Sequence, residues 1–570
     1  MALLSGFNVS INEVKLFSEA SRAAFDGGSI PSGWSVVTPG DLGLAAEYHD
    51  GNYFRGGSSG ASAIVLKNGN EYIVSFRGTD GANDVSRYLE LYTGKYIDHF
   101  KPLLDALAAQ APGDATFSFT GASLGGGATN LMAKIAASAY DGRFADAKFV
   151  AFASPNITNA NGILNIGFEN DPVYKAVGLH KDFASSLDNL VLATAEYMAG
   201  NTTGRQPFNM YAHSASLGFE AVNRLAESQF YDLMKPDSVI IFDAADDLVQ
   251  DRMSGRTKTG AFYLGESVAD QITGRDGNDY IEGFGGNDIL KGGKGNDSIR
   301  GGDGADLVQG EAGDDMLYGD ADDDTLAGGA GKDKSYGGPG DDTFVVSGTD
   351  AENDTFAGDN GVDRILVTGS VVLTLAGFNA AASSIEVWNG NGVAIAGTKN
   401  ANVFDFSGLN AVTDVPYIDG GKGNDTIIGS NFADELRGGA NNDTLNGGGG
   451  DDRLVGGAAN DMLTGGEGAD TFLFSESGTK NKDTILDYDF GENDVIDLAA
   501  LLDAKFGPSS VVNDFVRLTV SGLDILVQID ANGATSGAKF VDVAVLSGYS
   551  TAGVDQVLVQ FEQQAQVLAA

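Results

Sequence analysis

The sequence predicts two kinds of domain: an α/β domain, followed by an all-β domain of stacked parallel strands. Two observations lead to this prediction. In the N-terminal half, an alternating strand pattern at 115–120 runs into Gly-x-Ser-x-Gly at 121–125 and then into a helix of small residues. In the C-terminal half, an aspartate recurs every nine residues within glycine-rich sequence. Periodic patterns of these two kinds are typical of a strand–turn–helix unit and of a β solenoid.

Composition sets the limits on what the protein does. The 570 residues carry 35 basic and 79 acidic side chains, a net charge of −44, and 52 of the acids lie in residues 251–570. This charge excludes a nucleic-acid binder that works through a basic surface. A hydrophobic content of 42% is typical of a globular protein. The chain has no cysteine, which excludes disulfides, thiolate metal sites and a cysteine nucleophile.

The first candidate for chemistry is Ser123, in Gly121-Ala-Ser-Leu-Gly125. A serine on a tight turn between a strand and a helix is the nucleophile elbow of the α/β-hydrolase fold. There, two backbone N–H groups hold the oxyanion, one from the residue after the serine and one from an earlier strand end. Leu124 and Thr79, which follows the strand at 71–76, are the candidate donors. For Thr79, an ordinary strand exit is the alternative interpretation.

An acid and a base should follow the nucleophile in the order Ser, Asp, His. Asp171 comes after an apolar run at 163–168 and lies 48 residues beyond Ser123. Of the four histidines, only His180 and His213 follow it. We expect His213 to be the base, because it lies in a loop before a helix, whereas His180 is only nine residues from Asp171. The remaining two are expected at surface or satisfied polar positions.

The aspartates of the second half follow the nonapeptide pattern GGxGxDxUx, in which U is apolar. The fourteen phased residues are Asp279, Asp288, Asp297, Asp306, Asp315, Asp324, Asp333, Asp342, Asp425, Asp434, Asp443, Asp452, Asp461 and Asp470. Glycines permit positive φ and leave carbonyls open, so carboxylate and carbonyl oxygens meet in one turn, as a calcium ion requires. We expect all except Asp324 and Asp434 to be calcium ligands, since the glycines before those two are missing.

The apolar residue two places after each aspartate should point inward from a short strand, so that the strands stack into a parallel β-roll. Without metal, the carboxylates repel and the glycines cost entropy, so we expect calcium to gate the folding of this half. A glycine-rich acidic linker is the alternative, but linkers do not keep a nine-residue phase. The segment between the blocks is expected to continue the β architecture without phased aspartates.

The quoted motifs, with SFRGT, FENDPVYKAVG, SLDNLV and AHSASLGFEAVNRLAESQFYDLMKPDSVII, resemble the bacterial RTX lipases secreted by the type I pathway. The resemblance implies Ser123 as nucleophile, Asp171 as acid and His213 as base. It also implies a calcium site in the catalytic domain whose matching positions here are Asp182, Asp188 and Asn189. The local order His-Lys-Asp departs from the family pattern, so an acidic surface loop is the competing interpretation.

Other features bear on the same resemblance. The N-terminus has no secretory signal pattern and no apolar run reaches 18 residues, which agrees with export through an uncleaved C-terminal signal. Ala122 stands where the family typically has histidine. Only 44 residues separate Thr79 from Ser123, so the family's lid helices are expected to be missing or much reduced.

We therefore expect a secreted, monomeric, calcium-dependent serine ester hydrolase acting on triacylglycerol or, as a phospholipase A1, on glycerophospholipid. Its partners would be the lipid ester, transiently the lipid interface, and the type I secretion apparatus. The alternatives are a non-enzymatic RTX calcium-binding surface or adhesion protein and a cytosolic esterase. The expected domains are an α/β-hydrolase catalytic domain at 1–255, an RTX block at 256–345, an intervening β segment at 346–416, a second RTX block at 417–475, and a β cap with the secretion-signal region at 476–570.

Overall fold

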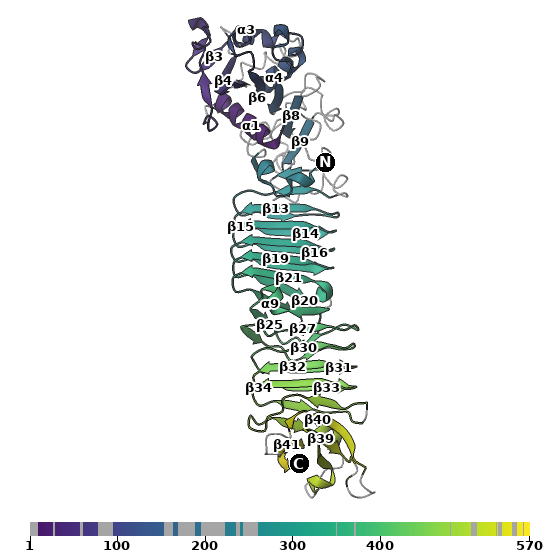
Figure 1. The fold of residues 1–570 in the computed structure, drawn as a ribbon. Helices are drawn as coiled ribbons and strands as arrows, with labels where there is room; N and C mark the ends of the chain where they lie inside the picture. The colour runs from purple at the N-terminus through teal and green to yellow at the C-terminus, as the bar shows by residue number, and fades with distance from the viewer. Residues whose placement is uncertain are drawn as a thin grey trace. The chain divides into compact units, whose positions relative to one another are not determined.

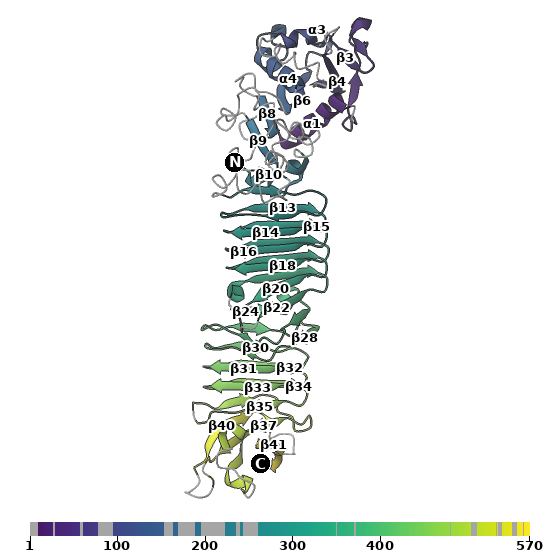
Figure 2. The same ribbon diagram turned by 180° about the vertical axis from the view of Figure 1, so that it is seen from behind.

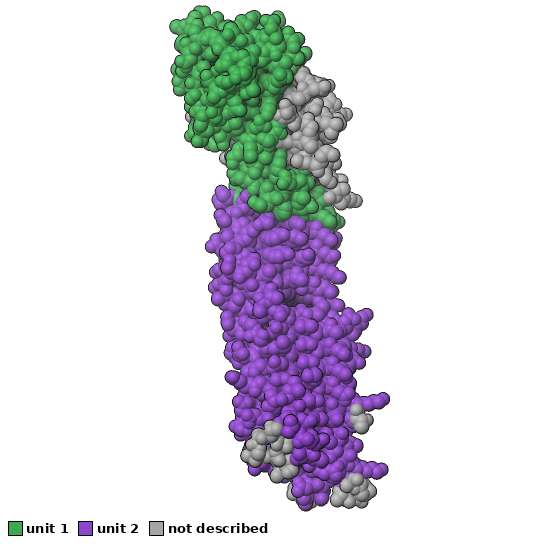
Figure 3. Space-filling model, in the orientation of Figure 1, with its two compact units in different colours: residues 1–266, 270–282 green, residues 267–269, 283–570 purple. Residues whose placement is uncertain are grey.

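The computed structural model divides into two compact units, residues 1–266 with 270–282 and residues 267–269 with 283–570 (Figure 3). The residues that the structure describes are 9–26, 29–56, 61–77, 95–122, 124–152, 163–168, 189–194, 223–234, 240–242, 260–348, 350–369, 372–478, 480–502, 510–531, 533, 539–549, 556–561 and 564–569. Within these residues, no helix is long and apolar enough to span a membrane.

The first unit is built on one mixed sheet (Figure 1). Its strands are β1 (Ser35–Val37), β2 (His49–Asp50), β3 (Tyr53–Arg55), β4 (Ser62–Asn68), β5 (Glu71–Phe76), β6 (Thr116–Ala122), β7 (Lys148–Phe152), β8 (Ile163–Phe168), β9 (Asn189–Thr194), β10 (Ile240–Phe242), β11 (Phe262–Leu264) and β13 (Tyr280–Gly285). Strand β12 (Gln271–Thr273) belongs to a different sheet. The pairs from β1 to β5 are antiparallel. From β5 onward the order β5-β6-β7-β8-β9-β10-β11-β13 is parallel.

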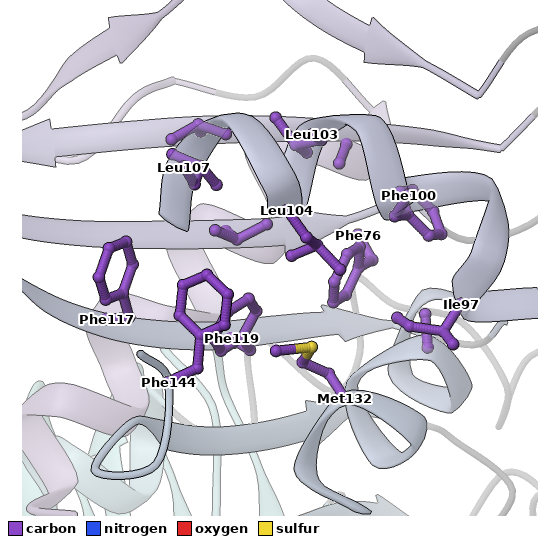
Figure 4. Close-up of a cluster of buried hydrophobic side chains, with 14 of the residues drawn as sticks. Phe76, Ile97, Phe100, Leu103, Leu104, Leu107, Phe117, Phe119, Met132 and Phe144 are labelled. Atoms are coloured by element: carbon purple, nitrogen blue, oxygen red, sulfur yellow. The ribbon is translucent and has the colours of Figure 1, made fainter. Parts of the chain in front are cut away.

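Helices cover both faces of this sheet. The helices are α1 (Ile11–Asp26), α3 (Lys101–Gln110) and α4 (Leu124–Ile135). Side chains from α3 and α4 pack with Phe117 and Phe119 of β6 in one core (Figure 4). Successive strand residues face opposite sides, and Thr120 instead hydrogen-bonds Ser21 of α1 at 2.8 Å. The arrangement is therefore the three-layer α/β/α sandwich of the α/β-hydrolase fold, which confirms the predicted class.

The second unit is a solenoid of short parallel strands stacked in sheets (Figures 1 and 2). Its first part contains β14 (Ile289–Lys294), β15 (Ser298–Asp303), β16 (Leu307–Ala312), β17 (Met316–Ala321), β18 (Thr325–Ala330), β19 (Lys334–Pro339), β20 (Thr343–Ser347), β21 (Thr355–Asn360), β22 (Arg364–Thr368), β25 (Val387–Asn389) and β28 (Ala411–Thr413). Successive strands up to β22 alternate between two sheets, and β25 and β28 extend the sheet that contains β22. Ile289 pairs with Leu307 and Ser298 with Met316, so one turn is two nonapeptides. The predicted parallel β-roll is confirmed.

The later part has the same construction. It contains β23 (Leu373–Thr374), β24 (Gly377–Asn379), β26 (Ile395–Ala396), β27 (Val403–Asp405), β29 (Ile418–Asp419), β30 (Thr426–Ile428), β31 (Glu435–Ala440), β32 (Thr444–Gly449), β33 (Arg453–Ala458), β34 (Met462–Glu467), β35 (Thr471–Leu473), β36 (Asp483–Ile485) and β37 (Val495–Asp497), with short helices α9 (Ala380–Ser383) and α10 (Ala499–Leu502). Antiparallel pairs follow, made by β38 (Val516–Ser521), β39 (Asp524–Ile529) and β40 (Val541–Leu546), and by β41 (Gln556–Phe561) and β42 (Gln564–Ala569).

The interior of the roll is the apolar column expected from the repeat. Ile299, Leu317, Leu445 and Leu463 are fully buried, each two places after its aspartate. In most of the nonapeptide strands a single Ile, Leu or Val side chain fills this interior, so the hydrophobic core alone is thin. Further interactions between successive turns lie at the corners of the roll, where the aspartates and glycines are.

Candidate functional site

The strand and helix expected around Ser123 are both present. Strand β6 runs to Ala122 and α4 begins at Leu124, so one residue joins them. Gly121, two residues before that junction, lies between Phe76 of β5 and Ala151 of β7. Ser123 itself lies outside the described residues. The local sequence order of strand, one residue and helix is the one that a nucleophile elbow requires.

The parallel topology determines which other predicted residues follow the same edge of the sheet. Parallel strands end at one edge, and β5, β6 and β8 end at Phe76, Ala122 and Phe168. Thr79 and Asp171 each come three residues after such an end. Both lie outside the described residues, as do His180, His213, Asp182 and Asp188. Asn189 is the first residue of β9.

The two histidines that precede the serine have local contacts. His49, in β2, is exposed, and its Nε2 lies 2.9 Å from the carbonyl oxygen of Leu44. The ring of His99 meets Tyr96 edge-on, with ring centroids 5.7 Å apart. These contacts are local to their own segments and fit the surface and polar positions expected for them.

Residues 223–234, which begin ten residues after His213, pack against β11 and β13 within the first unit. A helical turn covers 223–227. Ser228 is 7% exposed, and its hydroxyl donates to the 4% exposed carboxylate of Glu282 at 2.6 Å. The backbone N–H of Gln229 donates to the same carboxylate at 3.1 Å. Arg224 forms an ion pair with Glu266 at 2.8 Å. No local pattern in the sequence indicated this contact, because it joins residues about fifty positions apart.

The aspartates of the roll form ladders through their Oδ1 atoms. The backbone N–H of each donates to the Oδ1 of the aspartate one turn later: Asp288 donates to Asp306 and Asp306 to Asp324, both at 2.7 Å. In the second block, Asp425 donates to Asp443 at 2.7 Å. These carboxylates are almost completely buried. The ladder therefore uses one oxygen of each carboxylate to tie successive turns together.

The other oxygen, Oδ2, is where a cation fits. Among the described residues it is buried without a hydrogen-bond partner in Asp306, Asp315, Asp324, Asp342, Asp425, Asp443, Asp452 and Asp470. A β-carbon at Gly301 would lie 2.1 Å from Oδ2 of Asp306 and 2.7 Å from the carbonyl oxygen of Gly319. Gly447 stands in the same relation to Asp452, at 2.2 Å, and to Gly465, at 2.5 Å. A buried, unpaired carboxylate oxygen facing a carbonyl is the donor set of a hard cation such as calcium.

The electrostatics point in the same direction. Burial raises the pKa of Asp306 to about 7 and the pKa of Asp324 and Asp452 to about 8, while the backbone N–H donors oppose this and neighbouring carboxylates add to it. A positive ion beside the carboxylates favours their ionised form. The residues present therefore fit calcium, which supplies positive charge to the corners when bound.

Two repeats lack the glycines before their aspartate, and the structure differs between them. Asp324 was left out of the expected ligands, yet a β-carbon at Gly319 would lie 2.3 Å from its Oδ2, as at the expected ligands. The missing glycines are replaced by Asp320 and Asp322, whose φ values of 79° and 76° an aspartate tolerates. In contrast, Ser430 donates to Oδ2 of Asp434 from its N–H at 2.7 Å and its hydroxyl at 2.8 Å.

Asp279 and Asp363 also depart from expectation. The Oδ2 of Asp279 accepts the N–H of Arg275 at 2.7 Å, as the Oδ2 of Asp434 accepts that of Ser430. Asp363 lies in the segment expected to lack phased aspartates, and it is indeed out of the nine-residue phase, yet it joins the ladder. The N–H of Asp342 donates to its Oδ1 at 2.9 Å, which continues the ladder. The step is 21 residues instead of 18, so the nine-residue phase gave no signal.

Comparison with known proteins agrees with both halves. Residues 53–183 match the family Lipase (class 3). Overlapping segments between 264 and 344 and between 419 and 475 match the RTX calcium-binding nonapeptide repeat. The chain combines a class 3 lipase domain with RTX repeats.

Proteins named lipase are among those similar to this chain. Two proteins from Pseudomonas fluorescens, each named lipase, are 28% identical over 256 residues and 36% identical over 139 residues. The first match covers 37% of this chain and 54% of the relative, and the second covers 21% of this chain and 31% of the relative. The chain therefore spans about half the length of the first relative and about a third of the second. The crystal structure of extracellular lipase LipA from Serratia marcescens is similar over 97% of this chain and 98% of its own, with 22% identity and a TM-score of 0.44. The chain therefore combines a region similar to lipases with RTX calcium-binding repeats.

Proposed function

We propose that the chain is a secreted, calcium-dependent serine ester hydrolase that releases fatty acids from lipid esters. The observation that most supports this is the single-residue junction between β6 and α4 at position 123, on the edge where β5 and β8 also end. A serine there is the residue that an α/β-hydrolase uses as its nucleophile.

In the proposed mechanism, Ser123 attacks the carbonyl carbon of the ester while His213 takes its proton. His213 then protonates the departing alcohol, and Asp171 orients the imidazole through its other nitrogen. The N–H groups of Thr79 and Leu124 hold the oxyanion of the tetrahedral intermediate. Water, activated by His213, releases the fatty acid and restores the serine.

The repeats bind calcium, and we propose that this binding orders the roll outside the cell, where calcium is abundant. Export by the type I pathway, through a signal near the C-terminus, is part of the same proposal. So is a calcium site in the catalytic domain at Asp182, Asp188 and Asn189. We propose that the protein acts as a monomer.

For the substrate, we propose triacylglycerol together with glycerophospholipid, cleaved at the first acyl position. The short spacing of 44 residues between Thr79 and Ser123 favours an open site, because it leaves little chain for a lid. An open site admits phospholipids as well as oil droplets.

The test is hydrolysis of a triglyceride emulsion, phosphatidylcholine vesicles and a short-chain p-nitrophenyl ester by the purified full chain in calcium. Turnover of all three supports the proposal, and turnover of the triglyceride alone would restrict it to a lipase. Failure to hydrolyse any of them would favour the non-enzymatic alternative, a calcium-binding surface protein. Calcium binding measured on the same sample shows whether the protein tested was folded.

A further inference from the structure

One face of the roll carries a row of uncharged side chains that crosses a whole sheet. The nine strands of this sheet stand in the order β24-β27-β30-β32-β34-β36-β40-β39-β38 (Figures 1 and 2). Successive residues of each strand alternate between the buried interior and the outer face. The outward residues that lie opposite one another across the sheet are Gly377, Val403, Thr426, Thr444, Met462, Thr484, Val545, Leu526 and Thr519. None of these residues is charged, in a chain whose net charge is −44.

A second outward row extends this surface over the middle strands. Ile428, Asn446 and Thr464 lie opposite one another there. Leu486 follows Thr484 by two residues and continues the row. We call the two rows together the neutral face.

Charged groups at the borders of the neutral face are engaged with polar neighbours. Asp405 of β27 accepts a hydrogen bond from the amide of Asn379 at 3.0 Å. In the cap strands, Gln528 accepts from Arg517 at 2.8 Å and donates to Asp542 at 2.7 Å. One amide thus lies between two opposite charges, and the border adds no net charge there.

Apolar side chains of the neutral face reach into solvent. Val403 is 56% exposed, Met462 47% and Leu486 41%. The repeat does not demand an apolar residue at such a position, because the residue directly after the ladder aspartate is Lys334 in β19 and Arg453 in β33, on other sheets. Exposed apolar surface that the fold does not require marks a site of interaction.

The size of the neutral face argues against a second copy of the chain as its partner. Neighbouring strands lie about 4.8 Å apart, so the first row is about 40 Å long, and two outward residues make the face about 10 Å wide. Two such faces in contact would bury about 800 Å² in total, below the roughly 1,200–2,000 Å² of a stable protein interface.

The composition of the neutral face argues against a protein partner and against an anionic membrane. Hot spots of protein interfaces are rich in Trp, Tyr and Arg, and the neutral face has none of these. They stand on another face of the roll, where Arg300, Tyr318 and Tyr336 stack. Anionic lipid repels a chain with a net charge of −44. An uncharged and partly apolar sheet face instead matches the uncharged surface of an oil phase.

We propose that the neutral face binds the surface of a neutral-lipid droplet, with Val403, Met462 and Leu486 against the oil. The threonine and asparagine side chains between them keep their hydrogen bonds with water at the boundary. The proposal rests on the proposed lipid hydrolase function, and it adds that the roll itself adheres to the substrate phase.

The test is flotation of the full chain with a triolein emulsion in saturating calcium, in a Ser123→Ala background so that no fatty acid is released. Met462→Glu places a carboxylate against the oil, and we expect it to lower the bound-to-free ratio by at least about tenfold, because burying an unpaired charge is costly. Met316→Glu is the matched control. Met316 also directly follows a ladder aspartate, but it lies in β17 of another sheet, between Ser298 and Lys334. We expect its ratio to stay within about twofold of the parent.

Thr444→Glu guards against a folding defect, because Thr444 is exposed and lies opposite Met462. It should lower the ratio as Met462→Glu does. An unchanged ratio in either variant would overturn the proposal, and so would an equal loss in Met316→Glu. Tighter binding to phosphatidylglycerol vesicles than to triolein would also overturn it, as would a dimer in sedimentation that Met462→Glu dissociates.

A second measurement separates this proposal from the function on which it rests. With Ser123 intact, Met462→Glu should slow hydrolysis of limiting triolein emulsion by at least about tenfold and leave hydrolysis of soluble p-nitrophenyl acetate unchanged. An equal loss on both substrates would refute the role of the neutral face. A parent chain that hydrolyses neither substrate would contradict the proposed function, and flotation would still decide whether the neutral face binds lipid.

Discussion

The hydrogen bond between Ser228 and Glu282 should hold the segment after His213 in place, and Ser228→Ala tests this. Both groups are almost fully buried, and the hydroxyl lies 2.6 Å from a carboxylate oxygen. A hydrogen bond to a charged group contributes about 1.5–3 kcal/mol, more than a neutral one. The same hydroxyl also accepts the N–H of Phe230 at 3.1 Å, and this bond is lost with it.

We therefore expect Ser228→Ala to lower the free energy of local opening by about 1.5–3 kcal/mol, which is roughly a 10- to 150-fold increase in the opened population. The assay is native-state hydrogen exchange of the full chain in saturating calcium, read by mass spectrometry in peptides covering 223–234 and 260–266. Exchange in these peptides should accelerate by that factor, because local opening limits it.

Ser138→Ala is the matched control, since Ser138 is exposed and its hydroxyl donates only to a backbone carbonyl at 3.3 Å. A change within about 0.5 kcal/mol is expected there. If Ser228→Ala also stayed within that margin, the buried hydrogen bond would not be what fixes this segment, and the reasoning would be wrong.

Three other predictions concern calcium, the base and the lid. The raised pKa values of Asp306, Asp324 and Asp452 mean that their contribution to stability is fully present below about pH 4 and lost as pH rises through about 7–8. In calcium-free buffer the residual β structure seen by far-UV circular dichroism should therefore be greater at pH 5 than at pH 8, with the order reversed if burial does not govern these groups. Replacing His213 with alanine should abolish ester hydrolysis, whereas His180→Ala should leave most of it, and reversed outcomes would reassign the base. Hydrolysis rates should rise smoothly through the solubility limit of a triglyceride, and a sharp jump at the first oil–water interface would show that a lid exists.

The repeats were the most predictable part of the molecule. Each nonapeptide determines its own turn, strand and inward residue, so the roll, its pairing step and residues such as Leu317 follow from local sequence. Local sequence was less informative where another residue takes the place of a repeat glycine. Asp320 and Asp322 adopt the left-handed conformation of absent glycines, so Asp324 keeps its geometry. Asp363 was missed because an added turn shifted the phase by three residues.

Contacts between distant segments were beyond sequence reasoning. Glu282 occupies an outward repeat position that is half-buried in later turns, whereas Glu282 itself is buried beneath residues 223–234. No periodicity relates Ser228 to that position. In the α/β unit, by contrast, the strand–serine–helix order was readable, because the elbow is a local motif with a fixed backbone requirement. The triad remains a prediction from motif order and family resemblance.

The most direct test of the central claim is fatty-acid release by the full chain and by its Ser123→Ala variant, both loaded with calcium. Rates are measured on a triglyceride emulsion and on phosphatidylcholine vesicles, with circular dichroism and bound calcium recorded for each sample. We predict that the variant keeps the spectrum and the calcium count and loses activity by at least about 10³-fold, because the nucleophile is a small group on which the covalent step depends. A folded, calcium-loaded Ser123→Ala variant that hydrolyses either lipid at a rate near that of the parent would contradict the account.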